Sequence, residues 1–385
     1  VEFISKDKYD FYIFLSREKK DWKTGKKIYY LGVVPANKID YGSLNWKSSE
    51  KNPKNFIGIS ENLKANIQHS MSDQLWTEVE ISQDCSMSNV WNTVNLRDCI
   101  EGLSKMQDNS VDCIIIDPPY NIGKDFGNNK TKTEIFEYVD WSKKWITEAE
   151  RVLAPSGTMF IYGFSEILAF LAVELKLPYR WLTWHYTNKT TPTLNFWQRS
   201  HESILCVYKD SKKRIFNRDL VREPYTENYV KGYSGGKRKR KNTTGRFSRE
   251  GSEETTYKVH DKGALPRDVI KVSALAGGAG LRQRFVYNID DDRLYTKKEA
   301  KKKGFTNILS HPTQKPVELT EKLLLSCLDQ NKINSVVIPF CGTGSECHVA
   351  QYLEQEWISF EINQDYQRMA TALLRDGFPQ GNPLA

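Results

Sequence analysis

From about residue 92, short apolar runs alternate with longer stretches in which apolar residues recur at helical spacing. The run Val111–Ile116 is rich in β-branched residues and predicts a buried strand. A helical pattern then reaches residue 153, and Pro-Ser-Gly at 155–157 predicts a break before a strand at 158–162. This alternation predicts an α/β fold, with a mostly parallel twisted sheet and helices on both faces.

The same alternation returns near the C-terminus, after residues 211–307, in which the regular pattern is lost. There the sequence predicts a helix at 317–328, a strand at Ser335–Ile338, a helix at 345–353, a strand at 357–361 and a helix at 365–376. Residues 9–15 and 27–34 predict a strand hairpin in a polar N-terminal α+β extension. We therefore expect four regions, at 1–91, 92–210, 211–307 and 308–385.

The composition limits the class of protein. Of the 385 residues 39% are hydrophobic, and no apolar run approaches the roughly 20 residues that span a bilayer. The seven cysteines are scattered without a CxxC pair, which is typical of reduced thiols. The six histidines show no ligand spacing. We therefore expect a cytoplasmic protein with no membrane partner and no metal.

Positive charge is concentrated in one segment. The net charge is +8, and every charged residue from Lys231 to Arg249 is Lys or Arg. The centre of this basic block consists of Lys237, Arg238, Lys239, Arg240 and Lys241. Such a block suits the phosphates of a nucleic acid. A solvated loop or a localisation signal would show the same composition.

The motif Asp117-Pro118-Pro119-Tyr120 follows the predicted strand Val111–Ile116. Two prolines can neither continue a strand ladder nor start a helix interior, so the chain stays extended there. Ligands of open α/β sheets bind at the carboxyl ends of the strands. We expect Asp117 and Tyr120 to face a ligand crevice, although Asp-Pro-Pro also occurs as an ordinary strand-ending turn.

A second motif, Pro339-Phe340-Cys341-Gly342-Thr343-Gly344, follows the predicted strand Ser335–Ile338. Gly342 and Gly344 let the backbone approach a ligand closely just before a helix. Glu361 ends the next strand, where a carboxylate can accept hydrogen bonds from ribose hydroxyls. Together these features indicate a site for an adenosine-containing cofactor.

The Asp117–Tyr120 motif resembles the catalytic motif of the DNA amino-methyltransferases, which methylate adenine N6 or cytosine N4. Phe340-Cys-Gly-Thr-Gly344 resembles the FxGxG motif with which these enzymes bind S-adenosylmethionine. The catalytic motif comes first in this chain, as in the β group of the family. Segments around Asp98-Cys99 and Asp108–Asp112, His201-Glu202 and His311-Pro-Thr-Gln-Lys-Pro316 also resemble that group.

The resemblance implies a Rossmann-like methyltransferase that depends on S-adenosylmethionine. Residues 92–210 would form its catalytic half, 211–307 its target-recognition region and 308–385 its cofactor-binding half. The catalytic residues would be Asp117, Pro118, Pro119 and Tyr120. Cofactor contacts are implied for Asp98, Cys99, Asp117, Lys315, Pro316, Phe340, Cys341, Gly342, Gly344, Glu361 and Ile362. DNA contacts are expected from Trp197, from Arg199 and from the basic block.

The implied reaction methylates adenine N6 directly, after the base has been flipped out of double-stranded DNA. The Asp117 carboxylate and the Pro118 carbonyl would accept hydrogen bonds from the amine as its nitrogen gains positive charge. Tyr120 would stack on the base. The resemblance also allows a homodimer, a cognate restriction enzyme and a nucleoid location.

Ile338 departs from the family pattern, which usually has an acidic residue just before the Pro-Phe of the cofactor motif. The cofactor site could be weaker for this reason, could use another carboxylate, or could depend on a partner. The alternatives are therefore a cytosine-N4 methyltransferase and a partner-dependent nucleic-acid-binding subunit with a weakened cofactor site. An Asp at the first position of the catalytic motif favours adenine. An RNA methyltransferase is a third alternative.

Neutralising the basic block should weaken DNA binding. A variant with Gln at positions 237–241 should bind duplex DNA less tightly, and the slope of log K against log salt should flatten by about 0.9 for each phosphate that the block no longer neutralises. Fluorescence anisotropy over a range of salt concentrations measures both effects. An unchanged slope would exclude the block from the interface.

Overall fold

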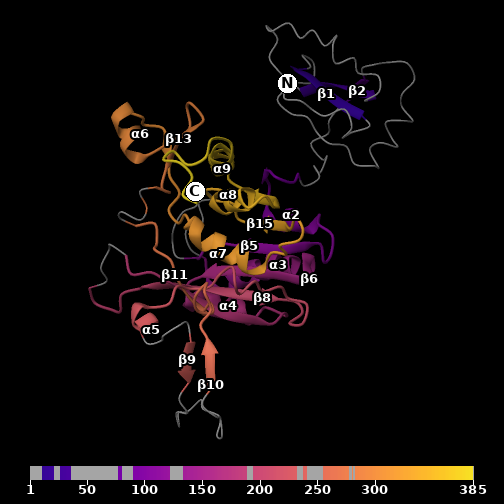
Figure 1. Cartoon of the computed structure of the whole chain (residues 1–385). Helices are drawn as coiled ribbons and strands as arrows, with labels where there is room; N and C mark the ends of the chain where they lie inside the picture. The colour runs from indigo at the N-terminus through magenta and orange to yellow at the C-terminus, as the bar shows by residue number, and fades with distance from the viewer. Residues whose placement is uncertain are drawn as a thin grey trace. The chain divides into compact units, whose positions relative to one another are not determined.

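The computed structural model divides the chain into two compact units, Val1–Met87 and Ser88–Ala385 (Figure 1). The residues that it describes in full are 90–121, 133–188, 194–231, 259–276, 280 and 282–384. For the strands at 11–20, 27–35, 77–79, 237–240 and 255–258 it describes the backbone.

The first unit contains an antiparallel sheet. Its strands are β1 (Phe11–Lys20), β2 (Lys27–Pro35) and β3 (Thr77–Val79), in the order β1-β2-β3. The predicted hairpin at 9–15 and 27–34 is confirmed, with longer strands than expected. Helices expected in this extension lie outside the described residues.

The second unit is built on a sheet of eight described strands in the order β11-β7-β8-β6-β5-β15-β16-β4. All neighbours pair in parallel except β8, which is antiparallel to β6 and β7. The bounds are β4 Val94–Leu96, β5 Val111–Ile116, β6 Leu153–Gly163, β7 Tyr179–His185, β8 His201–Tyr208, β11 Val269–Lys271, β15 Ser335–Ile338 and β16 Glu356–Glu361. This mostly parallel order confirms the predicted Rossmann-like fold.

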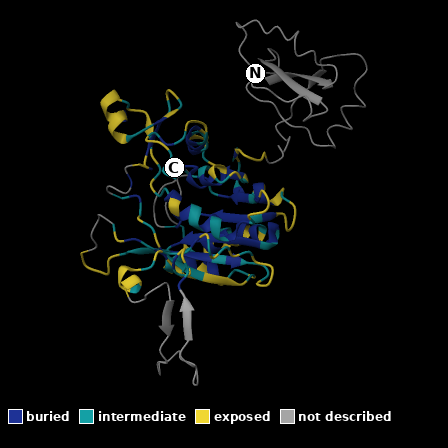
Figure 2. Ribbon diagram, viewed as in Figure 1, coloured by how far each residue is buried: buried dark blue, intermediate teal, exposed yellow. Residues whose placement is uncertain are grey.

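Helices cover both faces of this sheet, and the buried residues form two apolar layers between helices and strands (Figure 2). One face is covered by α2 (Cys99–Ser104), α3 (Ile135–Val152) and α4 (Ser165–Ala172). The other is covered by α7 (Val317–Cys327), α8 (Ser345–Tyr352) and α9 (Gln364–Asp376). Among the described residues, none of the helices is long and apolar enough to cross a membrane.

The helix α3 ends at Val152, one residue before its predicted end, but β6 begins at Leu153, five residues before the predicted strand at 158–162. The register with β5 shifts between Val111 and Cys113, so the Pro-Ser-Gly segment forms an irregularity within the strand. Proline is tolerated in a strand at such a position. A Cβ on Gly157 would lie 2.8 Å from the carbonyl oxygen of Val111, so the absence of a side chain lets the two strands approach.

The described residues within 211–307 are largely irregular, as expected, but they contribute short elements that the pattern did not predict. β11 joins the edge of the main sheet beside β7, and three short strands form a separate sheet in the order β13-β12-β14. The bounds are α5 Glu227–Lys231, β9 Lys237–Arg240, β10 Thr255–Lys258, β12 Val286–Asn288, β13 Arg293–Tyr295, α6 Lys297–Lys303 and, just beyond, β14 Ile308–Leu309. The helix α4 was also not predicted.

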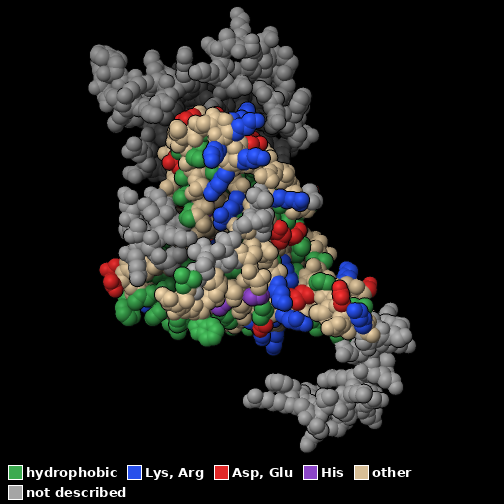
Figure 3. All heavy atoms as spheres, turned by 90° about the vertical axis from the view of Figure 1, so that its left-hand side faces the viewer, with side chains coloured by type: hydrophobic (Ala, Val, Ile, Leu, Met, Phe, Trp, Pro, Cys, Tyr) green, Lys and Arg blue, Asp and Glu red, His purple; other side chains and the backbone are tan. Residues whose placement is uncertain are grey.

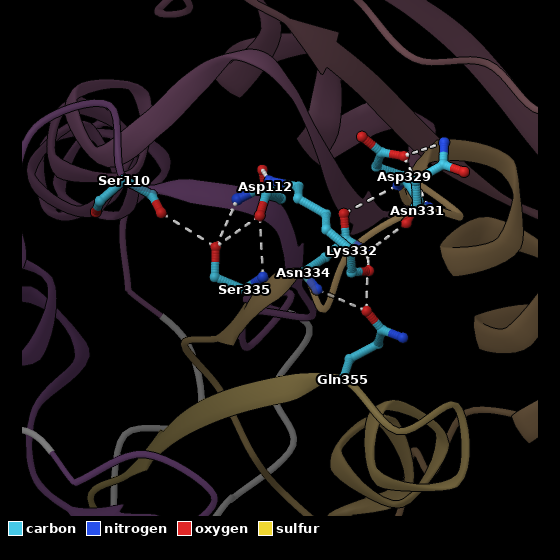
Figure 4. A network of polar contacts seen from close by, with 8 residues as sticks. All are labelled: Ser110, Asp112, Asp329, Asn331, Lys332, Asn334, Ser335 and Gln355. Atoms are coloured by element: carbon cyan, nitrogen blue, oxygen red, sulfur yellow. Dashed lines mark hydrogen bonds and ion pairs between the residues drawn. The ribbon is translucent and has the colours of Figure 1, made fainter.

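A polar network fixes β5 against β15 where both strands begin (Figure 4). Asp112 accepts the Ser335 backbone N–H at 3.0 Å, and the Ser335 hydroxyl accepts the Asp112 backbone N–H at 3.0 Å. The side chain of Asn334, which is buried, donates to the carbonyl of Asp329 and to Gln355 Oε1, each at 2.9 Å. Since the starts are aligned, the two strands end side by side, which brings Asp117 and Pro339 to one edge of the sheet.

Asn334→Ala should destabilise the second unit, because it removes four part-buried hydrogen bonds of this side chain. We expect the free energy of unfolding to fall by roughly 1–3 kcal/mol. Urea denaturation followed by tryptophan fluorescence measures the change. Asn331→Ala is the matched control on the exposed side of the same turn and should change stability by less than about 0.5 kcal/mol. Equal effects would show that the network does not hold this edge.

Candidate active site

A cavity of about 510 Å³ opens at the carboxyl ends of β5, β15 and β16. This volume lies within the roughly 300–1,000 Å³ of small-molecule sites. The predicted site residues on its wall are Asp98, Cys99, Asp117, Pro118, Pro119, Lys315, Phe340, Cys341, Gly342, Glu361 and Ile362. The structure therefore brings most residues of the two motifs to one cavity.

The first wall is organised by an ion pair between Asp117 and Lys315. Asp117 directly follows β5, and Lys315 lies two residues before α7. The Lys315 ammonium contacts both carboxylate oxygens of Asp117 at 2.7 Å, and its side chain is 3% exposed. Burial alone would lower the pKa of Lys315, but Asp117 and Glu202 outweigh it and the pKa lies above its usual value.

Tyr120 and Glu202 complete this buried network. The Tyr120 hydroxyl lies 2.6 Å from Asp117 Oδ1, to which it donates, and 3.2 Å from Glu202 Oε2. Glu202, in β8, lies 3.8 Å from the Lys315 ammonium. Burial raises the pKa of Glu202 despite this cation. In this network two carboxylates, those of Asp117 and Glu202, therefore share the one ammonium of Lys315.

The ring of Tyr120 lies behind the cavity rather than on its wall. It is 5% exposed and makes an edge contact with Phe164 at 5.1 Å between ring centroids. The guanidinium of Arg199 lies over the Phe164 ring, 4.1 Å from its centroid, and forms an ion pair with Glu166. Stacking of Tyr120 on a base stays a prediction, and it would require the ring to become exposed.

The opposite wall is the glycine turn between β15 and α8. Gly342 and Gly344 have φ of +52° and +80°, which favours glycine. A Cβ on Gly342 would lie 3.1 Å from the His311 ring, and one on Gly344 would lie 2.9 Å from Ala370. The Gly342 N–H donates to Glu361 Oε2 at 2.9 Å. The turn therefore holds Glu361, and burial raises the pKa of this carboxyl.

The other residues that were predicted to bind the cofactor do not all contribute to the cavity wall. Asp98 is the N-cap of α2 and accepts the N–H of Ile100 at 2.8 Å, so part of its hydrogen-bonding capacity is structural. Pro316 takes the N-cap position of α7 and lies outside the cavity lining. Gly344 likewise shapes the turn from outside the lining.

Ile338 does not contribute to the wall of the cavity. Its side chain is 1% exposed and belongs to the apolar layer under α7, α8 and α9. The wall contains instead a carboxylate that the sequence reasoning missed, Glu346 in the first turn of α8. An acidic residue two positions after Gly344 was the available signal. Glu137 and Trp141 of α3 also line the cavity and were not singled out.

Of the expected DNA-binding residues, Trp197 and Arg199 do not line this cavity. The side chain of Trp197 is 85% exposed, in the segment between β7 and β8. Residues 237–240 form β9, which pairs with β10, and Lys241 lies outside the described residues. Figure 3 shows Lys and Arg side chains gathered on one face, where α6 carries Lys301, Lys302 and Lys303 in its last turn.

Within the part of the chain that the structure describes, there is no group of three or more His, Cys, Asp or Glu residues placed to hold a metal ion. The cavity instead combines carboxylates, an ammonium and a glycine turn. This set suits an organic ligand that carries hydroxyl groups and positive charge.

Lys315→Met should test how far the fold depends on the buried cation. Without it the carboxylates of Asp117 and Glu202 would be buried with no counter-ion, which destabilises the fold. We expect a loss of about 3–5 kcal/mol near neutral pH, which shrinks as acid protonates Glu202, whose pKa is raised by burial. Urea denaturation at neutral and acidic pH measures this.

The control for that variant is Lys322→Met, which removes an ion pair with Glu223 at 3.4 Å nearer the surface. That change should cost about 0–1 kcal/mol. A loss for Lys315→Met as small as that of the control would show that Lys315 is not a required counter-ion.

Comparison with known proteins identifies the family. Residues 111–372 match the model of an N6/N4 family described as DNA methylase. The chain is 29% identical over 284 residues to the type II methyltransferase M.HpaI of Haemophilus parainfluenzae, which covers 72% of this chain and 73% of that protein. It is 26% identical over 277 residues to the DNA adenine methyltransferase YhdJ of Escherichia coli (strain K12), covering 71% and 79%.

A solved structure, the PvuII DNA methyltransferase (cytosine-N4-specific), aligns with a TM-score of 0.47 and 14% identity, over 73% of this chain and 86% of that one. The family match spans both cavity walls, from the strand before Asp117 to the helix after Glu361. The chain therefore belongs to the N6/N4 family of DNA methylases.

Proposed function

We propose that this DNA methyltransferase transfers a methyl group from S-adenosylmethionine to N6 of adenine in double-stranded DNA. The observation that carries the proposal is the Asp117 carboxylate on the wall of a cavity whose opposite wall is a glycine turn with a terminal acid. The first wall offers a hydrogen-bond acceptor for an amine. The second offers the contacts that an adenosine-containing cofactor needs.

The residues of the second wall fit S-adenosylmethionine. Glu361 ends β16 with its carboxylate fixed by the Gly342 and Asn363 N–H groups at 2.9 Å each, and lone pairs remain for ribose hydroxyls. Phe340 makes edge contacts with Trp141 and Trp145 and presents an aromatic surface beside the cavity. When bound, the cofactor supplies an electrophilic methyl group.

Asp117 and Pro118 would activate the amine. The lone pair of an exocyclic amine is delocalised into the base, so transfer requires a more sp3-like nitrogen. The Asp117 carboxylate and the Pro118 carbonyl would accept its two N–H groups, and these hydrogen bonds strengthen as positive charge develops. Lys315 contacts both oxygens of Asp117 and so fixes the direction of this carboxylate. Most of the rate enhancement would come from this positioning.

A duplex base reaches such a cavity only after it has been flipped out, at a cost of a few kcal/mol. Phosphate contacts would orient the duplex, and lysine-rich segments such as α6 and the basic block would provide them. These segments lie in residues 211–307, the stretch proposed to recognise the target sequence. A homodimer and a cognate restriction enzyme remain predictions.

Adenine is proposed over cytosine because the first residue of the catalytic motif is Asp. The E. coli relative that carries the name DNA adenine methyltransferase agrees with this choice. The test is to methylate duplex DNA with the purified protein and to identify the modified nucleoside by mass spectrometry. N6-methyladenine is expected. N4-methylcytosine would establish the other specificity, and methylated RNA without methylated DNA would refute the proposed substrate.

Asp117→Ala should abolish transfer and leave cofactor binding nearly intact. Loss of an acceptor that acts in the transition state costs about 100- to 1,000-fold in rate. Lys315 keeps Glu202 as a partner at 3.8 Å, so the variant should fold. Single-turnover methyl transfer and calorimetric titration with S-adenosylmethionine measure the two properties.

The matched control is Asp112→Ala, at the other end of the same strand, which should lower stability without changing the single-turnover rate. Full activity of the Asp117 variant would refute the mechanism.

A further inference from the structure

Glu346 is a buried carboxylate on the cavity wall with a role still to be assigned. It is 4% exposed and lines the cavity from the first turn of α8. The Ser345 hydroxyl donates to its Oε2 at 2.8 Å, and the Thr343 hydroxyl donates to Ser345 at 3.2 Å. Burying a carboxylate is costly unless it is paired with a cation. Its position beside a ligand cavity indicates that the ligand provides this cation.

The charges around Glu346 leave room for a positive ligand. The ionisable groups that face it are Asp117 after β5, Lys315 before α7 and Tyr162 in β6. Lys315 is bound by both oxygens of Asp117, so its charge is already shared. Burial, and then the charge of Asp117, raise the pKa of Glu346 to about 7. A bound cation would restore the ionised form.

We infer that Glu346 binds the α-ammonium group of the methionine moiety of S-adenosylmethionine. The inference rests on the proposed function, because it requires that cofactor. The cofactor also carries a sulfonium, but this charge disappears when the methyl group leaves. A carboxylate against the sulfonium would stabilise the ground state more than the transition state. The ammonium keeps its charge throughout, so pairing with it adds affinity without raising the barrier.

This assignment accounts for the apolar residue at position 338. Ile338 ends β15 inside the apolar layer that α8 helps to cover, and Glu346 lies in the first turn of that helix. The carboxylate that the strand end lacks is supplied from the helix eight positions further on. The site therefore needs no partner protein to complete its charge.

Calorimetric titration of the full chain with three ligands tests the inference. S-adenosylmethionine and S-adenosylhomocysteine both carry the ammonium, and 5′-methylthioadenosine lacks it. Glu346→Gln should weaken binding of the first two by about 10- to 100-fold and leave binding of the third unchanged. The control Glu361→Gln, on the proposed ribose side, should weaken binding of all three. Thermal unfolding verifies that both variants are folded.

The pH dependence gives a second readout. Below pH about 7 the Glu346 carboxyl of the wild-type protein is protonated. The affinity for S-adenosylhomocysteine should therefore decrease as the pH is lowered, by up to about tenfold per pH unit. The Glu346→Gln variant should lack this dependence, and so should 5′-methylthioadenosine binding to the wild type.

Two results would overturn the inference alone: unchanged affinity of Glu346→Gln for S-adenosylhomocysteine, or an equal loss for 5′-methylthioadenosine. Failure of the wild type to bind any of the three ligands would overturn the proposed function, and this inference with it. The two failures are therefore distinguishable in one set of titrations.

Discussion

The buried ion pair between Lys315 and Asp117 is the interaction on which the active site depends. It joins residues separated by 198 positions, one after β5 and one before α7. Both carboxylate oxygens lie 2.7 Å from the ammonium, which fixes the direction of the carboxylate. Loss of Lys315 would leave the buried carboxylates of Asp117 and Glu202 without a cation, which is strongly destabilising. The same ion pair thus links two segments that are distant in sequence and orients the proposed acceptor.

Three carboxylates lie at different places on the wall of the cavity around this pair. Asp117 directly follows β5, Glu361 ends β16, and Glu346 lies in the first turn of α8. The parallel register of β5, β15 and β16 brings all three to one edge of the sheet. Asp117 faces the proposed site of the base, Glu361 that of the ribose and Glu346 that of the ammonium group. Such a division suits a cofactor with hydroxyl groups at one end and a cation at the other.

Much of this architecture follows from local sequence signals. The buried strands β5 and β15 were predicted to the residue, because apolar runs bounded by turn residues are local features. The bulge around Gly157 was missed, because it depends on the backbone of the neighbouring strand. The pairing of Lys315 with Asp117 and the burial of Tyr120 were missed for the same reason. They arise from contacts between distant segments, which residue patterns do not encode.

A double-mutant cycle between Lys315→Met and Asp117→Asn tests the central claim most directly. The free energies of unfolding of the wild type, both single variants and the double variant give the coupling between the two side chains. A functional buried pair predicts a coupling of about 1.5 kcal/mol or more. Additivity within about 0.5 kcal/mol would contradict the account, because the two groups would then be independent.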